Sequence, residues 1–120
     1  MALSVLIVDD SAFMRNMLKK LITEAGAQVI GEAGNGREAI DKFGQLKPQL
    51  VFMDIMMPDV NGIEALKGII SKDKAAKVVM CTSVGQDKVV NEAVEAGASD
   101  FIVKPFTKDD VTTVITKYAG

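Results

Sequence analysis

Five short runs of apolar, mostly β-branched residues recur along the chain, and each precedes a segment in which apolar residues repeat with helical spacing. The runs are Val5–Val8, Val29–Ile30, Leu50–Met53, Val78–Cys81 and Phe101–Val103. Strands that are almost entirely apolar are buried on both faces, which a parallel sheet covered by helices on each side provides. The pattern therefore predicts five βα units in series, a doubly wound α/β fold, in one domain over residues 1–120.

The ends of the predicted helices carry signals of their own. Four residues resemble the first member of a capping box, with Glu, Gln or Asp three positions later: Asn35, Asn61, Ser83 and Thr107. Three glycines fall where helices should end: Gly26, Gly44 and Gly97. The dipeptide Asn35-Gly36 alone would suggest a hairpin turn, but the helical pattern after it favours a cap.

Apolar stripes predict which helix faces enter the core. The stripes of the first and last helices are Phe13, Met17, Leu18, Leu21, Ile22 and Val111, Val114, Ile115, Tyr118. Methionines near the ends of the strands are interpreted as core filling too: Met14, Met53, Met56 and Met57.

Composition excludes several classes of function. With 48% hydrophobic residues, 25% charged residues and a net charge of −2, the chain is typical of a globular protein and has no basic stripe for nucleic acid. The segment MALSVLIVDD reaches two acids too early for a signal peptide, and no apolar run approaches the roughly 18 residues of a membrane span, so we expect a cytoplasmic protein. The single cysteine, Cys81, predicts a small buried hydrophobe, and the absence of histidine excludes histidine-dependent catalysis and zinc sites.

Polar residues follow four of the five apolar runs. They are Asp9 and Asp10, Asp54, Thr82 and Ser83, and Lys104, whereas the second run is followed by nothing comparable. Each alone reads as a solvated loop residue, a cap or a surface charge. Because parallel strands end at one edge of a sheet, where such folds bind ligands, we expect these residues to form one site.

Three neighbouring carboxylates require a cation. Oxygen ligands without histidine or thiolate favour Mg²⁺, or Mn²⁺, over zinc, and a lysine opposite would counter the charge of a phosphoryl group. This combination is typical of phosphoryl transfer, for which a carboxylate is a known nucleophile. Asp54 leaves the strand expected at the middle of the sheet and is the predicted nucleophile, while Asp9 and Asp10 form the metal-binding pair.

Four segments, VLIVDDSAFMR, MDIMMPDVNGIEAL, VVMCTS and AGASDFIVKPF, resemble the receiver domain of two-component response regulators, in the same order and spacing. The chain is most similar to stand-alone chemotaxis receivers of the CheY type, and DDSAFMR also resembles the receivers of chemotaxis methylesterases. The resemblance implies a flavodoxin-like (βα)5 fold with strand order 2-1-3-4-5.

The resemblance also implies roles for residues of the site. Asp54 would be the phosphoacceptor for the phosphohistidine of a sensor kinase. Asp10 would bind Mg²⁺ directly and Asp9 through water, with Asp54 and the backbone carbonyl of Met56 as further ligands. Lys104 would contact Asp54 and then the phosphoryl group.

Two residues would form a switch by the same resemblance. Thr82 would bond a phosphoryl oxygen and Phe101 would turn into the vacated space, altering the face made by the fourth helix, fifth strand and fifth helix. The Lys104-Pro105 bond would be cis.

Some positions depart from the family pattern. Phe101 stands where many members have tyrosine, so a hydrogen bond from that hydroxyl is absent. Met56 and Val84 stand two residues after Asp54 and Thr82, where the family influences water attack on the acyl phosphate, and neither side chain can orient water. We therefore expect slow self-dephosphorylation or a separate phosphatase.

The resulting prediction is a monomeric, phosphorylation-activated signalling switch that acts without an output domain and catalyses only its own phosphorylation and dephosphorylation. Its expected partners are a chemotaxis-type sensor histidine kinase and a flagellar or archaellar switch protein or adaptor. A phosphorelay intermediate of the sporulation type is the alternative within the family.

Three other functions fit the residues less well. A haloacid dehalogenase-type phosphatase would need an aspartate at Met56 and room for a cap. A flavodoxin-like FMN binder would meet repulsion from Asp9 and Asp10. The third is a receiver that has lost phosphorylation and acts as a scaffold.

Overall fold

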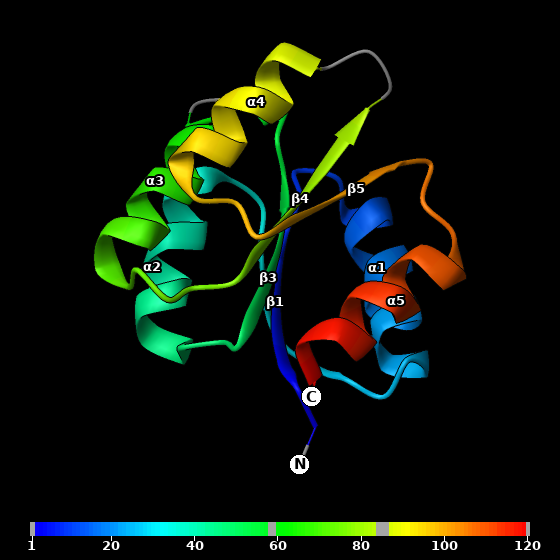
Figure 1. Ribbon diagram of the computed structural model, residues 1–120. Coiled ribbons are helices and arrows are strands. Elements are labelled where there is room, and N and C mark those ends of the chain that lie inside the picture. Colours follow the sequence, from blue (N-terminus) through cyan, green and yellow to red (C-terminus); the bar gives the residue numbers. More distant parts are fainter. Residues whose placement is uncertain (1, 58–59, 84–86, 120) are drawn as a thin grey trace.

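In the computed structural model, which describes residues 2–57, 60–83 and 87–119, five strands alternate with five helices (Figure 1). The strands are β1 (Ser4–Val8), β2 (Gln28–Ala33), β3 (Leu50–Asp54), β4 (Val78–Ser83) and β5 (Asp100–Lys104). The helices are α1 (Ala12–Glu24), α2 (Gly36–Leu46), α3 (Gly62–Lys72), α4 (Asp87–Ala96) and α5 (Lys108–Ala119). The predicted series of five βα units is confirmed.

The strands form one parallel sheet in the order β2-β1-β3-β4-β5. β3 lies in the middle, between β1 and β4, and all five of its residues are buried. The strand order and the central position of the third strand are therefore as predicted. Since all strands run the same way, their carboxyl ends share one edge of the sheet.

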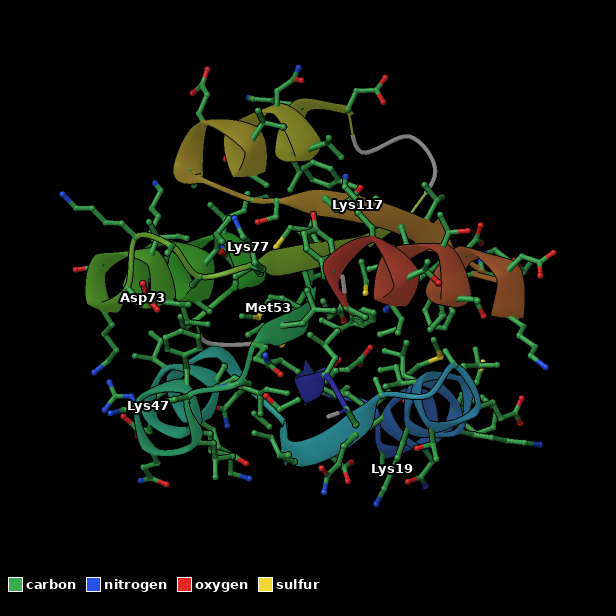
Figure 2. All side chains as sticks on the ribbon, turned by 60° about the horizontal axis from the view of Figure 1, so that its bottom comes forward. Lys19, Lys47, Met53, Asp73, Lys77 and Lys117 are labelled. Carbon is green, nitrogen blue, oxygen red and sulfur yellow. The ribbon has the colours of Figure 1, made fainter. Side chains whose placement is uncertain are left out.

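Helices cover both faces of the sheet (Figure 2). One core cluster joins the sheet to α2, α3 and α4, and the other joins it to α1 and α5. Neighbouring strand residues alternate between the two clusters, as Leu6 and Ile7 do. Because both faces of the sheet are buried, the side chains on both faces are apolar. This explains why the strands read as continuous apolar runs. No helix within the described ranges combines the length and the apolar character needed to cross a bilayer.

The predicted caps hold at three of four helix starts. The side chains of Asn35 and Asn61 accept hydrogen bonds from the backbone N–H groups three residues later. Thr107 and Asp110 form a reciprocal capping box, in which each side chain accepts from the other's backbone N–H. Ser11, which the sequence did not single out because Met14 stands at its third following position, caps α1.

One predicted helix boundary was wrong and one is not tested. Ser83 is the last residue of β4 and α4 is described from Asp87, but residues 84–86, which include the expected partner Gln86, lie outside the described residues, so the cap at Ser83 stays a prediction. Gly44 lies inside α2, which ends where Lys47 adopts a left-handed conformation with φ of 49°. Pro48 follows, and a residue before proline is driven out of the helical conformation. Gly26 and Gly97, with φ of 94° and 108°, end their helices as predicted.

Two predicted core residues face solvent. Phe13 is 73% exposed, because α1 buries the side centred on Leu18 and Ile22, and roughly 3.6 residues per turn place Phe13 well away from it. Met56 is 62% exposed because it follows β3 in the loop above the sheet, whereas Met53 and Met57 are buried as predicted. Met14 is partly buried against the α1–α5 core.

Candidate functional site

The parallel topology brings the residues after β1 and β3 together at the carboxyl edge of the sheet. One carboxylate oxygen from each of Asp9, Asp10 and Asp54 lies within 4.8 Å of the other two. Asp9 and Asp54 are 2% and 6% exposed, whereas Asp10 is exposed to solvent. Two buried carboxylates and one accessible carboxylate thus share one small space, although they lie up to 45 residues apart in sequence.

Lys104, the last residue of β5, supplies the positive charge of this cluster. Its Nζ lies 3.3 Å from Oδ2 of Asp9 and 3.3 Å from Oδ1 of Asp54. The Lys104-Pro105 peptide is cis, as the family resemblance implies. The ammonium therefore bridges the two buried acids and leaves Asp10 toward solvent.

Burial and the neighbouring charges together shift the pKa values of Asp54 and Lys104. Burial raises the pKa of Asp54 above its ordinary value; Lys104 opposes that rise, and the charge of Asp9 adds to it. Burial alone would lower the pKa of Lys104, but the carboxylates of Asp54 and Asp9 raise it above its ordinary value. Lys104 is thus held in its charged form, while the charge on Asp54 is incompletely compensated.

The two predicted switch residues lie on β4 and β5, the two strands that follow β3 across the sheet. Thr82, on β4, is 5% exposed, and its hydroxyl donates to the backbone carbonyl of Ser83 at 3.4 Å. Phe101, on the neighbouring strand β5, is partly buried and packs against the core on the α2–α4 side. Neither side chain belongs to the acid cluster in this conformation, and Val84 lies outside the described residues.

Local turns hold the two buried acids in place. Oδ1 of Asp9 accepts from the backbone N–H of Ser11 at 2.9 Å, and Oδ1 of Asp54 accepts from that of Met56 at 3.3 Å. The sequence did not single out Gly62, at the start of α3, whose backbone approaches so closely that a Cβ there would collide with the carbonyl of Asp54. An isolated Asn-Gly dipeptide in the sequence does not reveal such an approach.

The donor set fits a hard divalent cation. Three carboxylates provide oxygen ligands at short mutual distance, which suits Mg²⁺ or Mn²⁺. The only thiol, Cys81, is 2% exposed, and burial raises its pKa to about 12, so it remains protonated. It behaves as the small buried hydrophobe that the sequence predicted.

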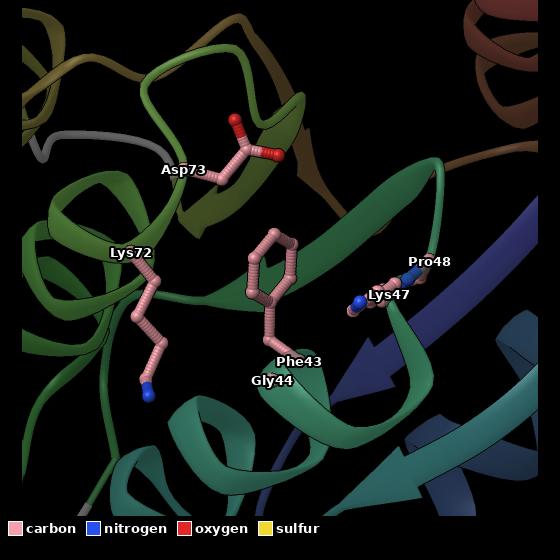
Figure 3. Close-up of a pocket in the computed structure, with 6 residues that line it drawn as sticks. All are labelled: Phe43, Gly44, Lys47, Pro48, Lys72 and Asp73. Atoms are coloured by element: carbon pink, nitrogen blue, oxygen red, sulfur yellow. The ribbon is translucent and has the colours of Figure 1, made fainter.

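A hollow of about 460 Å³ lies at the opposite edge of the sheet (Figure 3). It opens between the C-terminal ends of α2 and α3, and its lining residues are Phe43, Gly44, Lys47, Pro48, Lys72 and Asp73. With a single carboxylate, this hollow does not reproduce the acid cluster.

A family model of the response regulator receiver domain matches residues 5–116. The chain belongs to this family. Within it, the receiver domain is 56% identical to the chemotaxis protein CheY of Thermotoga maritima over 113 residues, which cover 94% of each chain. It is 49% identical to the chemotaxis protein CheY of Bacillus subtilis over 117 residues, or 98% of each chain.

A solved structure agrees with this assignment. CheY in the CheX-CheY-BeF3-Mg complex of Borrelia burgdorferi superimposes on this receiver domain with a TM-score of 0.92 at 34% identity, covering 98% of this chain and 90% of that one. The predicted membership among CheY-like receivers of two-component systems is confirmed.

Proposed function

We propose that this receiver domain is a phosphorylation-activated switch in chemotaxis, in which Asp54 accepts a phosphoryl group from a sensor histidine kinase. The observation that carries the proposal is the placement of Lys104 Nζ at 3.3 Å from both Asp9 and Asp54, beside three clustered carboxylates. One of these acids must react and the others must be neutralised for a phosphate anion to approach.

Asp54 is the acid best placed to react. It ends the central strand, its Oδ1 is held by Lys104 and by the backbone N–H of Met56, and it is nearly buried. A carboxylate oxygen of Asp54 forms a bond to phosphorus while the bond from phosphorus to the donor histidine nitrogen breaks. The imidazole takes up one proton from solvent, so an acyl phosphate remains on Asp54 and a neutral imidazole on the donor. Lys104 stabilises the charge on the transferring group.

The remaining acids would hold the cation. We assign Asp9, Asp10, Asp54 and the backbone carbonyl of Met56 to Mg²⁺, with Mn²⁺ as a substitute. A cation bound there would neutralise the carboxylates and the phosphoryl oxygens. Asp10, the exposed member, is oriented toward solvent, from which both the cation and the donor arrive.

The output of the switch would pass through Thr82 and Phe101. Thr82 is buried on β4 and Phe101 is partly buried on β5, so an inward rotation of the Phe101 ring would bury more of it. Phosphorylation would favour a conformer in which the Thr82 hydroxyl bonds the phosphoryl group and the ring fills the space behind it. The face of α4, β5 and α5 then changes, which is a shift between two existing states.

The partners are inferred from the relatives. Two full-length relatives are chemotaxis proteins, and the Borrelia protein is complexed with CheX. We therefore assign a chemotaxis-type histidine kinase as donor, a flagellar or archaellar switch protein or adaptor as target, and a separate phosphatase. We further propose that residues 1–120 form one domain and that the protein is cytoplasmic and monomeric.

The test is phosphorylation by acetyl phosphate with Mg²⁺, followed by intact mass. Wild type gains the mass of one phosphoryl group, Asp54→Asn gains none, and Asp41→Asn, an exposed acid on α2, behaves as wild type. An unchanged mass of the wild type would refute the proposal, as would full labelling of Asp54→Asn. Incubation with a phosphorylated chemotaxis kinase then tests the donor.

A further inference from the structure

Arg15, on the first turns of α1, joins three separate elements through one mostly buried side chain. Its Nη1 donates to the backbone carbonyl of Asp9 at 2.6 Å, and its Nε donates to Oε1 of Glu32, on β2, at 3.2 Å. The segment DDSAFMR contains this arginine, yet no role in the site follows for it from the sequence. The contact with Asp9 gives it one.

The carbonyl that Arg15 holds belongs to the peptide that links Asp9 to Asp10. A peptide group is planar, so fixing its oxygen fixes the plane and the direction in which Asp10 leaves the chain. The N–H of Asp9 is held as well, because it donates to the carbonyl of Ala33 at 3.1 Å. Asp10 itself is exposed, so its orientation depends on this backbone more than on packing.

The chemistry of the guanidinium suits this task. It remains charged, its donors keep a rigid planar geometry, and a hydrogen bond from a charged donor is roughly twice as strong as a neutral one. Glu32 accepts from Nε and so fixes the plane of the guanidinium while Nη1 reaches Asp9. A lysine has one nitrogen and cannot reproduce this two-point geometry.

We propose that Arg15 is a positioning residue of the acid cluster: it fixes the Asp9–Asp10 peptide and thereby sets the affinity of the cluster for a divalent cation. The inference rests on the proposed function, because the cation matters only if the cluster binds one. Arg15 touches neither Asp54 nor Lys104 in the described part of the chain, so it acts through the backbone between the two metal-binding acids.

The chain offers a matched control. Lys19 Nζ lies 3.9 Å from the same Glu32 carboxylate, and no contact joins it to Asp9 among the residues that the structure describes. Arg15→Ala and Lys19→Ala therefore remove the same charge from the same network, and only the first releases the Asp9 carbonyl. Arg15→Lys keeps the charge and loses the two-point geometry.

The experiment measures Mg²⁺ affinity without a phosphodonor, by following backbone amide signals during a Mg²⁺ titration, together with urea unfolding of each variant. The dissociation constant of Arg15→Ala should rise about tenfold, as when other residues that orient metal ligands are removed, and Lys19→Ala should stay close to wild type. Arg15→Lys should fall between them. In phosphorylation by acetyl phosphate, Arg15→Ala should need a higher Mg²⁺ concentration than wild type. Its phosphorylation rate should approach that of wild type at saturating Mg²⁺.

Two results would overturn the role of Arg15: a folded Arg15→Ala or Arg15→Lys with wild-type Mg²⁺ affinity, or an equal loss in Lys19→Ala. If Arg15→Ala does not fold, Arg15→Lys decides, since it keeps most of the packing while losing the two-point geometry. A wild type that binds no Mg²⁺ would instead refute the proposed function.

Discussion

Lys104 Nζ lies 3.3 Å from Oδ1 of Asp54, and this lysine must serve a second buried carboxylate, that of Asp9, at the same distance. One positive charge is thus shared by two buried negative charges. Desolvation and the neighbouring acid outweigh it at Asp54, whose pKa is raised. The receiver carries an electrostatic cost at the site where it is expected to react.

This cost predicts that Asp54→Asn stabilises the metal-free protein. Because the pKa of Asp54 is raised in the folded state, its ionised form is less favourable there than in the unfolded chain. This penalty on folding is present at neutral pH. It disappears as the pH falls toward the pKa of an unfolded-chain aspartate, about 4. Urea unfolding in EDTA should show a gain on the order of 1 kcal/mol at neutral pH that shrinks on acidification. A less stable Asp54→Asn at neutral pH would contradict the argument.

Asp10→Asn should separate the cluster's binding role from its structure. Asp10 is exposed, so neutralising it removes repulsion without opening the core, while one of the three clustered oxygens loses its charge. Mg²⁺ binding and phosphorylation should fall below detection, and the unfolding free energy without metal should stay equal or rise. The control Asp41→Asn, which alters an exposed acid on α2, should leave Mg²⁺ binding, phosphorylation and the unfolding free energy unchanged. If Asp10→Asn bound Mg²⁺ with wild-type affinity, Asp10 would not be a ligand of the metal.

The side chain of Met56 predicts slow loss of the phosphoryl group. It is 62% exposed two residues after Asp54, where a thioether can neither donate a hydrogen bond to an attacking water nor accept a strong one. Met56→Asn should therefore speed dephosphorylation severalfold, and Met56→Leu should not. The decay of the phosphorylated mass in Mg²⁺ buffer measures the rate, and rapid decay of the wild type would show that another group orients the water.

Cys81 should be inert in the folded protein. It is buried beside the acid cluster, and its pKa of about 12 leaves almost no thiolate at neutral pH. Iodoacetamide should label Cys81 readily in urea. In the native protein, labelling should be slow, because it requires the sheet to open. Full labelling of the native protein within minutes would contradict the burial of β4.

The sequence predicted most of the fold because the spacing of apolar residues along the chain reflects which residues are buried. Apolar runs located all five strands, and caps at Asn35, Asn61 and Thr107 located three helix starts. An error occurred where local signals compete: Gly44 lies inside α2, since Pro48 and not the glycine ends that helix. Phe13 belongs to an apparent stripe but faces solvent, because only the packing of α1 decides which side is buried.

By itself, the sequence determined that acids, a hydroxyl and a lysine end four neighbouring strands, because parallel strands share a carboxyl edge. Only the tertiary structure decided which of these residues are buried, which are exposed and which contact one another. It buried Asp9 and Asp54 around one lysine and exposed Asp10. It also brought Arg15 to the carbonyl between the paired acids. Those contacts join residues distant in the chain, and their geometry is set by how helices pack on the sheet.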